Sequence, residues 1–263
     1  MNNSCKKNKI KNNKNKVRLI ITQIIILIIF FTIWELLAYY NVINTFIFSK
    51  PSDIFNLLIQ YIKTNEIFKH IKISLLETLF GIFFGSLLGI FIASILWYFE
   101  ILQKIFNPFL NVLNALPKTA LAPIMIIWAG ADFKGIVVVA ISILLIITVL
   151  STYNHFNNVN IEKIKMLESF KSTKLQIFFK LILPSILKNI FNVIKINVGM
   201  SWVGVIVGEF LVSKEGLGYL IMYGGQVFKL DLVMMGVIVL AIIAFFMNVI
   251  IECIEKILIK ERE

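Results

Sequence analysis

The chain has 263 residues, of which 59% are hydrophobic, and its mean hydropathy is +0.87. Soluble domains are about half apolar and rarely contain several uninterrupted apolar runs of about twenty residues. The composition therefore excludes an ordinary soluble domain. It predicts an all-α, polytopic membrane protein whose length suits one compact bundle with little room for a separate soluble domain.

The positive charge of the chain is concentrated where a membrane protein places it. The formal net charge of +11 would suggest nucleic acid in a soluble protein, but residues 1–18 alone contain six lysines and Arg18, with no acidic residue. Basic residues at the end of a span stay in the cytoplasm. We therefore expect a basic cytoplasmic tail, a lipid bilayer as partner and no nucleic acid.

The first apolar run, Leu19–Ala38, allows two interpretations. One is a cleaved signal peptide and the other is a retained membrane anchor. The run is as long as a span, which exceeds a typical signal-peptide core, and it lacks a small-residue cleavage site. These features favour the anchor.

Six apolar segments have the length of membrane spans. They are residues 19–40, 74–98, 106–129, 135–153, 190–212 and 232–254. With the N-terminus inside, six crossings return the C-terminal residues 255–263 to the cytoplasm, and the lysine-rich loop 154–189 also faces inward. The 41–73 loop holds four lysines and follows this rule less cleanly. We predict a multi-pass protein of the plasma membrane.

The 41–73 loop contains a helix-start signal at Pro51, Ser52 and Asp53. Apolar residues follow at helical spacing, namely Ile54, Leu57, Leu58 and Tyr61. This pattern predicts a short amphipathic helix on the outer surface.

Nothing in the sequence indicates catalysis. There is no GxxxxGK[ST] nucleotide-binding motif and no nucleophile–base or paired-carboxylate arrangement. The two cysteines, Cys5 and Cys253, and the two histidines, His70 and His155, show no ligand spacing. We therefore expect no metal, no cofactor and no enzymatic activity in this chain, and no nucleotide site of its own that would drive it.

Small residues recur every four positions in the second apolar segment. They are Gly81, Gly85, Gly89 and Ala93. This spacing lets two helices approach closely in lipid, where no hydrophobic force drives them together. The groove serves either ordinary packing inside the bundle or an interface that moves.

The third apolar segment carries a polar face. Asn107, Asn111, Asn114 and Lys118 follow at steps of four, three and four residues, so they share one side of a helix. An ionisable residue at membrane depth usually faces a cavity, and we expect Asn111, Asn114 and Lys118 to line a translocation pathway. The alternative is that Lys118 extends to the headgroup zone. Glu209, near the outer end of the fifth segment, has the same two interpretations.

The cytoplasmic loop contains two short helical patterns. Ile161, Ile164, Leu167 and Phe170 form one apolar stripe, with Leu167 and Phe170 expected to face the same way. Thr173 and Gln176 then match a capping box, so a break is predicted at Ser172–Thr173. Such helices either lie on the bilayer or fit into a cytosolic partner.

Several stretches resemble the permeases of binding-protein-dependent ABC importers. The stretch "KSTKLQIFFKLILP" resembles their cytoplasmic coupling motif, closing at Pro184, although Lys171 stands where the family has Gly and Lys165-Met166-Leu167 where it has Glu-Ala-Ala. "WELLAYYNVINTFIFSKPSDI", "HIKISLLETLFGIFFGSLLG", "LNALPKTALAPIMIIWAGADFKG" and "WVGVIVGEFLVSKEGLGYLI" resemble the permeases for nitrate, sulfonates and taurine, in the same order.

The resemblance implies a type I ABC importer permease fold with a core at 70–254, preceded by a first span and outer helix at 19–69. It implies a second permease copy, cytosolic ATP-binding subunits and an extracellular solute-binding protein, with a small anion, sulfonate or related solute moving inward. The residues it places at the ATPase are Leu167, Phe170, Lys171, Ser172, Thr173, Gln176 and Pro184.

The competing hypothesis is a self-sufficient secondary carrier or an intramembrane scaffold. A carrier of this kind is typically built from two halves with matching interrupted helices and a coupling-ion site. We find no repeat between the halves and few acidic residues in the spans. A neighbouring ATPase gene and binding-protein gene would decide between the two classes.

Overall fold

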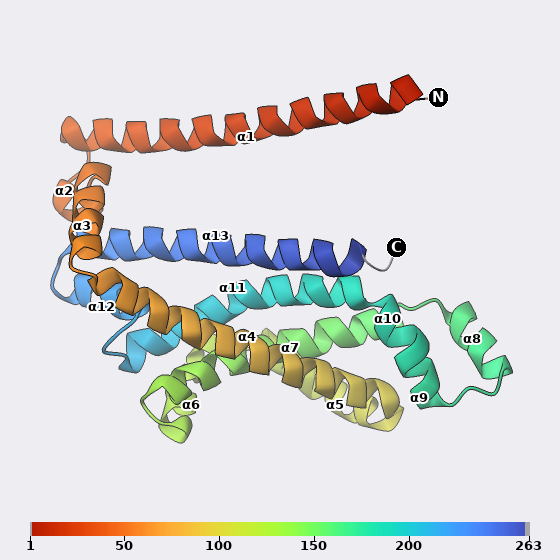
Figure 1. The fold of residues 1–263 in the computed structure, drawn as a ribbon. Helices are drawn as coiled ribbons and strands as arrows, with labels where there is room; N and C mark the ends of the chain where they lie inside the picture. Colours follow the sequence, from red (N-terminus) through yellow and green to blue (C-terminus); the bar gives the residue numbers. More distant parts are fainter. Residues whose placement is uncertain (1, 261–263) are drawn as a thin grey trace.

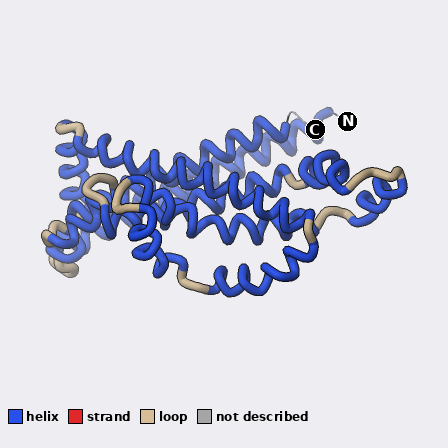
Figure 2. The backbone as a smooth tube through the Cα atoms, turned by 90° about the horizontal axis from the view of Figure 1, so that it is seen from below, coloured by secondary structure: helices blue, strands red, loops and turns tan. Residues whose placement is uncertain are grey.

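A computed structural model describes residues 2–260 of the chain. Residue 1 and residues 261–263 lie outside the described part, as do the side chains of residues 2–17. The side chains of the predicted basic tail, apart from Arg18, and the last residues of the predicted cytoplasmic C-terminus therefore fall outside it. Within the described part, all regular secondary structure is helical, and short loops join the helices (Figures 1 and 2).

Five helices are long and apolar enough to cross a membrane. They are α1 (Asn2–Tyr39), α4 (Glu66–Tyr98), α7 (Phe133–Asn157), α11 (Leu187–Val212) and α13 (Leu230–Lys260). The shorter helices are α2 (Thr45–Phe48), α3 (Pro51–Lys63), α5 (Glu100–Ala115), η1 (Lys118–Leu121), α6 (Ala122–Ala129), α8 (Ile161–Ser169), α9 (Lys174–Ile177), the π-helical turn η2 (Phe178–Ile182), α10 (Leu183–Ser185) and α12 (Leu217–Gln226).

The third apolar segment is not a straight helix. It consists of α5 followed by η1 and α6, with a bend of 93° between them. Leu116 has an extended backbone (φ −68°, ψ 142°) because the residue before Pro117 is excluded from the helical region. Counting this bent pair as one span gives six spans, as the sequence predicts.

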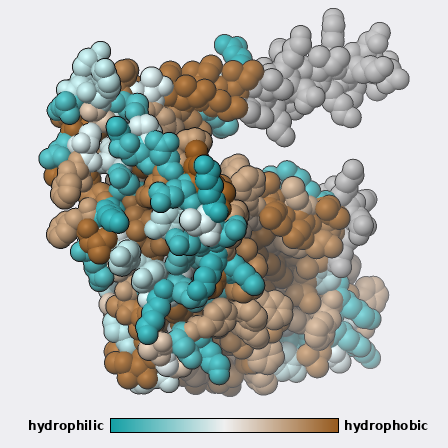
Figure 3. Space-filling view, turned by 60° about the vertical axis from the view of Figure 1, so that its left-hand side comes forward, coloured by the Kyte–Doolittle hydropathy of each residue, from teal (hydrophilic) through white to brown (hydrophobic). Residues whose placement is uncertain are grey.

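The start of α1, the end of α13 and the helices of the 154–189 loop lie at the same end of the bundle (Figure 1). In Figure 1, the start of α1, the end of α13 and helices α8 and α9 are all on the right. Helices α2, α3 and α12 lie at the opposite end. Figure 3 shows hydrophilic side chains gathered on that opposite end, with hydrophobic side chains along the flanks, as expected for a bundle that crosses lipid.

The predicted amphipathic helix is confirmed as α3, with Pro51 in its first turn. Ile54 is buried, and Leu57, Leu58 and Tyr61 pack against the same apolar core as α11, α12 and α13. Helix α1, in contrast, contacts the rest of the chain mainly through α3. Only 6% of the residues in its most apolar 18-residue stretch are buried. The four helices α4, α7, α11 and α13 therefore form the body of the bundle, and α1 stands beside it.

Helix α7 is the centre of the bundle and makes the two most extensive helix contacts, with α4 and with α11. The predicted glycine groove lies at the first of these contacts. A Cβ atom at Gly85 would overlap Leu144 of α7, and one at Gly89 would lie 2.5 Å from Thr148 Cγ2. On the α11 side, a Cβ at Gly204 would lie 2.5 Å from Ala140 Cα.

The remaining glycine of the groove is also enclosed. A Cβ at Gly81 would lie 2.9 Å from the Cβ of Ala140 and 2.7 Å from the Ser201 hydroxyl. These glycines therefore lie at close contacts between helices of one chain.

Polar side chains connect the same three helices in their buried interior. The Asn197 amide of α11 donates a hydrogen bond of 2.8 Å to Ser86 of α4, and its carbonyl accepts one of 3.0 Å from Thr148 of α7. All three side chains are buried. Because these groups are buried, the Asn197 amide keeps both of its hydrogen bonds only when the three helices stay in register.

This packing predicts opposite outcomes for two glycine-to-alanine substitutions. Alanine in a helix interior normally stabilises by roughly 0.5–1 kcal/mol relative to glycine. Gly199→Ala should show this gain because no atom lies within 4 Å of its new methyl group. Gly85→Ala should destabilise by about 1–3 kcal/mol, because Leu144 is fully buried and cannot move aside.

Thermal unfolding of the two purified variants in one detergent measures the difference. A Gly85→Ala variant at least as stable as Gly199→Ala would contradict the close α4–α7 packing.

Candidate functional site

The polar residues predicted to line a pathway lie on α5 and η1. Asn111 and Asn114 are exposed on α5, a helix with no buried residue. The Lys118 ammonium group, beyond the bend, donates to the Asn114 backbone carbonyl at 2.9 Å and to its side-chain oxygen at 3.3 Å. The structure thus brings an amide and an ammonium group together on an open face.

Glu209 occupies a different environment. It is 1% exposed, and its carboxylate accepts hydrogen bonds from the Ser74 hydroxyl of α4 and from the Gly218 amide at the start of α12. The Ser74 oxygen in turn accepts from the Leu217 amide at 2.7 Å. Oxygen acceptors at the first turn of a helix satisfy backbone amides that have no partner within the helix. Glu209 thereby joins α4, α11 and α12, with the equally buried Glu77 beside it.

Gly216 makes this arrangement possible. Its backbone has φ +114°, a conformation that other residues rarely adopt, and a Cβ atom there would overlap the Glu209 carboxylate. Ser74 was not predicted to be a partner of Glu209. The sequence feature that could have indicated a role for Ser74 is its spacing, because Ser74 and Glu77 lie on the same helical face as Gly81 of the glycine groove.

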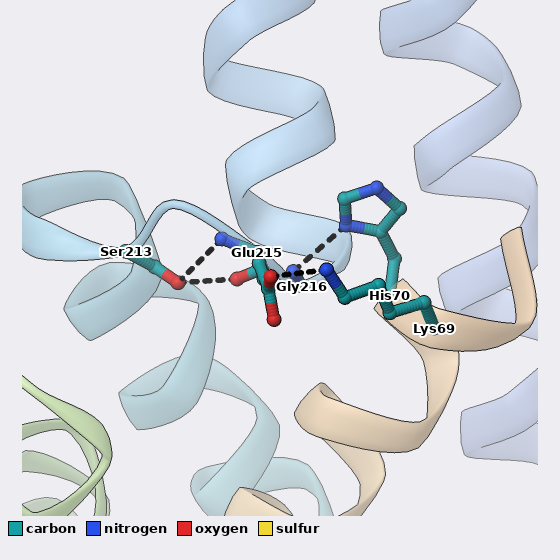
Figure 4. Close-up of polar contacts among 5 residues, drawn as sticks. All are labelled: Lys69, His70, Ser213, Glu215 and Gly216. Atoms are coloured by element: carbon teal, nitrogen blue, oxygen red, sulfur yellow. Dashed lines mark hydrogen bonds and ion pairs between the residues drawn. The ribbon is translucent and has the colours of Figure 1, made fainter. Parts of the chain in front are cut away.

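A second set of contacts fastens the α11–α12 loop to the start of α4 (Figure 4). The His70 Nδ1 atom accepts a hydrogen bond of 2.9 Å from the Gly216 amide, and Lys69 forms an ion pair with Glu215. The Ser213 hydroxyl oxygen accepts from the Glu215 amide at 3.1 Å. Together with the Glu209 contacts, these form an outer polar junction that fixes the position of α12.

At the opposite end, the predicted break between two short helices is confirmed. Helix α8 ends at Ser169, and Lys171 has φ +58°. Thr173 caps α9, because its hydroxyl accepts from the Gln176 amide at 3.3 Å while the Gln176 side chain accepts from the Thr173 amide at 2.9 Å. This is the predicted capping box.

The apolar stripe of α8 does not stay on one side. Ile164 and Leu167 pack inward against the buried cluster that contains Phe156 and Ile177. Phe170 follows the last helical residue of α8, so its side chain no longer points to the same side as Ile164 and Leu167, and it is 75% exposed. The expectation that Leu167 and Phe170 face the same way is therefore wrong. Pro184 lies in α10, beyond the π-helical turn η2, and is exposed.

Three aromatic rings attach this segment to the bundle. Phe178 of η2 lies 5.3 Å from Trp97 at the end of α4 and 5.4 Å from Phe156 at the end of α7, measured between ring centroids. Offset and edge-to-face rings at such distances attract each other. We refer to Trp97, Phe156 and Phe178 as the aromatic clamp. Sequence periodicity did not reveal it because the rings come from three separate segments.

Lys174, the first residue of α9, also turns toward its own chain. Its ammonium group lies 3.2 Å from the Glu100 carboxylate and over the rings of Trp97 and Tyr98, at 5.6 and 5.7 Å from their centroids. A cavity of about 400 Å³ adjoins these contacts. It is lined by Trp97, Glu100, Tyr153, Asn157, Ile164, Glu168, Ser172, Lys174 and Ile177.

Residues 85–262 match the family described as "Binding-protein-dependent transport system inner membrane component". The chain belongs to this family. It is therefore a transport permease rather than an enzyme, and it is the membrane-spanning subunit of an ABC importer. Systems of this family include an ATP-binding subunit and a solute-binding protein, and the permease is an integral protein of the plasma membrane.

Named relatives cover most of this permease. It is 26% identical to an aliphatic sulfonates transport permease protein, SsuC, of Bacillus subtilis (strain 168), over 88% of this chain and 83% of that protein. It is 22% identical to the taurine transport system permease protein TauC of Escherichia coli (strain K12), over 88% and 86% of the two chains.

A solved structure shares the fold. A chain of the MetNI methionine ABC transporter in an inward-facing conformation superimposes with a TM-score of 0.65. The superposition covers 72% of this permease and 94% of that chain at 16% identity. This likeness confirms the predicted type I ABC importer permease fold.

Proposed function

We propose that this permease imports a small sulfonate or related anion along a route lined by α5 and η1, between two copies of the chain. The observation that carries the proposal is the open polar face formed by Asn111 and Asn114 of α5, a helix without a buried residue, together with Lys118 of η1, which donates to Asn114 across the bend. An apolar bundle exposes amide and ammonium groups to lipid only at a large cost, so such a face favours contact with water and solute.

The chemistry of this face suits an anion. A lysine ammonium group donates charge-assisted hydrogen bonds to oxyanions, and neighbouring amide groups add neutral donors. Lys118 is half-buried and held beside Asn114, so its charge has a fixed position. Relatives named for aliphatic sulfonates and taurine support the same substrate class, because both kinds of molecule carry a sulfonate group.

Lys118→Met tests the anion route. Losing a charge-assisted hydrogen bond, worth about 1.5–3 kcal/mol, should raise the concentration for half-maximal uptake by roughly 10- to 100-fold. Lys118→Arg should retain most uptake, because the guanidinium group is also a cationic donor. Uptake of radiolabelled taurine and ethanesulfonate into vesicles containing the complete transporter is the measurement.

Lys134→Met is the matched control, since Lys134 is an exposed lysine in the first turn of α7. Equal uptake by the Lys118→Met and Lys134→Met variants would exclude Lys118 from the route.

The proposed orientation places α8, α9 and both chain ends in the cytoplasm. The lysines of the 154–189 loop and the N-terminal basic tail support it, because both lie at the same end of the bundle (Figure 1). Cysteines introduced separately at Lys165 of α8 and at Lys214 of the α11–α12 loop test it, since both positions are exposed.

In intact cells, a membrane-impermeant thiol reagent should label Lys214→Cys and should leave Lys165→Cys unlabelled until the membrane is opened. Native Cys5 and Cys253 are replaced by serine beforehand. Labelling of Lys165→Cys but not of Lys214→Cys in intact cells would contradict this orientation and support the opposite one.

The ATP-binding subunit is proposed to sit on α8 and α9, with Phe170 as its main anchor. Phe170 is a large aromatic side chain that is 75% exposed at the turn after α8, which the proposed orientation places in the cytoplasm. A buried aromatic anchor at a protein interface commonly contributes 2 kcal/mol or more. Lys171, Ser172 and Thr173 follow it in the turn and are proposed to form the polar rim of the same contact, with Gln176 holding Thr173 in place.

Phe170→Ala should therefore weaken binding of the ATP-binding subunit about thirtyfold or more while leaving the thermal stability of the permease unchanged. Phe179→Ala, an exposed phenylalanine of η2 that borders a lipid-facing groove, is the control.

Co-purification of the ATP-binding subunit from detergent extracts measures the loss, and the native mass of the wild-type complex reports whether it contains two permease copies. Retention by Phe170→Ala equal to that by Phe179→Ala would refute the anchor.

A further inference from the structure

Helix α5 packs loosely against α4 and α7. None of its sixteen residues is buried. A single non-helical residue, Phe99 (φ −106°, ψ 90°), separates it from α4, and the bend at Leu116–Pro117 separates it from α6. A helix without buried residues, between two backbone breaks, can change direction at low cost to the core.

The first break is bridged by one side chain from the cytoplasmic segment. The Lys174 ammonium group contacts the Glu100 carboxylate at 3.2 Å, and Glu100 is the first residue of α5. The same group lies over the rings of Trp97 and Tyr98, the last residues of α4. Lys174 therefore contacts the helix on each side of Phe99.

The position of Lys174 is fixed by its own helix. It is the first residue of α9, directly after Thr173, whose capping box with Gln176 sets the start of that helix. The next turn, η2, is attached to α4 and α7 through the aromatic clamp. A displacement of α9 is thus transmitted to the core through the clamp and to α5 through Lys174.

The surroundings leave space for such a displacement. The cavity of about 400 Å³ lies between the cytoplasmic helices and the ends of α4 and α7, and both Lys174 and Glu100 line it. Its other charged lining residue is Glu168 of α8, which offers Lys174 a second carboxylate if α5 moves away. The lysine can therefore change its carboxylate partner without being left unpaired.

We propose that Lys174 is a positioning residue that couples movement of the α8–α9 segment to α5, and thereby to the polar face of Asn111 and Asn114. This inference rests on the proposed function, since it assumes that α5 lines the route and that an ATP-binding subunit moves α8 and α9. It assigns Lys174 a role inside the permease rather than at the contact with the ATP-binding subunit.

The test uses the complete transporter in liposomes, with ATP-binding subunit and binding protein, and compares Lys174→Met with Lys180→Met. Lys180 is an exposed lysine of the neighbouring turn η2, and methionine keeps most of the side-chain stem in both variants. An exposed ion pair with an aromatic contact shifts an equilibrium by roughly fivefold. Lys174→Met should lower the amount of taurine or ethanesulfonate transported per ATP hydrolysed by about that factor, and Lys180→Met should not.

Two further measurements separate positioning from a general structural defect. The exchange Lys174→Glu with Glu100→Lys should restore at least part of the transport ratio that each single variant loses. In a background with Asn114→Cys, the labelling rate of the cysteine should depend on ATP when Lys174 is present and should lose this dependence in Lys174→Met.

The outcomes are distinguishable. A transport ratio for Lys174→Met equal to that for Lys180→Met, or no recovery on charge exchange, overturns the inference. Loss of the ATP-binding subunit from Lys174→Met would instead make Lys174 a docking residue and would also overturn it. If the wild-type complex itself shows no ATP-dependent uptake of either sulfonate, the proposed function fails and not only the role of Lys174.

Discussion

The close approach of α7 to α4 and α11 is the contact on which the other features of the bundle depend. Lipid tails are as apolar as the side chains, so the hydrophobic effect does not drive helices together inside a membrane. Helices associate there through close packing and buried hydrogen bonds. Glycines at positions 85, 89 and 204 bring the backbones together, and Asn197 then joins the three helices through Ser86 and Thr148. The result is a rigid three-helix core that can carry attachments at both ends.

The two ends of this core are fastened by different chemistry. At the end with α12, a buried carboxylate and backbone amides hold the α11–α12 loop, and an ion pair and His70 extend the contact to the surface. At the end with α8 and α9, aromatic rings make the attachment and one exposed lysine adds a charge. Directional hydrogen bonds define a single geometry, whereas tilted and edge-to-face rings tolerate small displacements. The difference suits a fixed end at α12 and, in the proposed orientation, a more adaptable cytoplasmic end at α8 and α9.

Local sequence rules predicted the elements of this fold well and their contacts poorly. Apolar length located every span, Pro51 located the start of α3, and Thr173 with Gln176 located α9, because each signal lies within a few residues of its effect. Pro108, Pro117 and Pro123 indicated that the third segment could bend, and the structure places the bend at Leu116–Pro117, where proline restricts the backbone of its predecessor.

In the candidate sites, too, local spacing predicts contacts between nearby residues but not contacts between distant segments. Asn114 and Lys118 share a face because they are four residues apart, and the structure keeps them together across the bend. The partners of Glu209 lie on α4 and α12, more than a hundred residues away in one case, and no periodicity connects them. Phe170 was expected to follow Leu167, but periodicity holds only while the helix continues, and α8 ends at Ser169. Pairing between distant segments is set by tertiary packing.

A solute route imposes a requirement opposite to that of the core. The core is held in part by polar groups that pair with one another, as Asn197 does with Ser86 and Thr148, and such paired groups leave no hydrogen-bonding capacity for a solute. A route needs polar groups whose hydrogen-bonding capacity is free, and these destabilise a lone helix in lipid. The proposed route along α5 meets both conditions if a second copy of the chain sets another polar surface against it, as a symmetric dimer would. Because α5 has no buried residue, a contact as small as that of Lys174 with Glu100 is proposed to influence its direction.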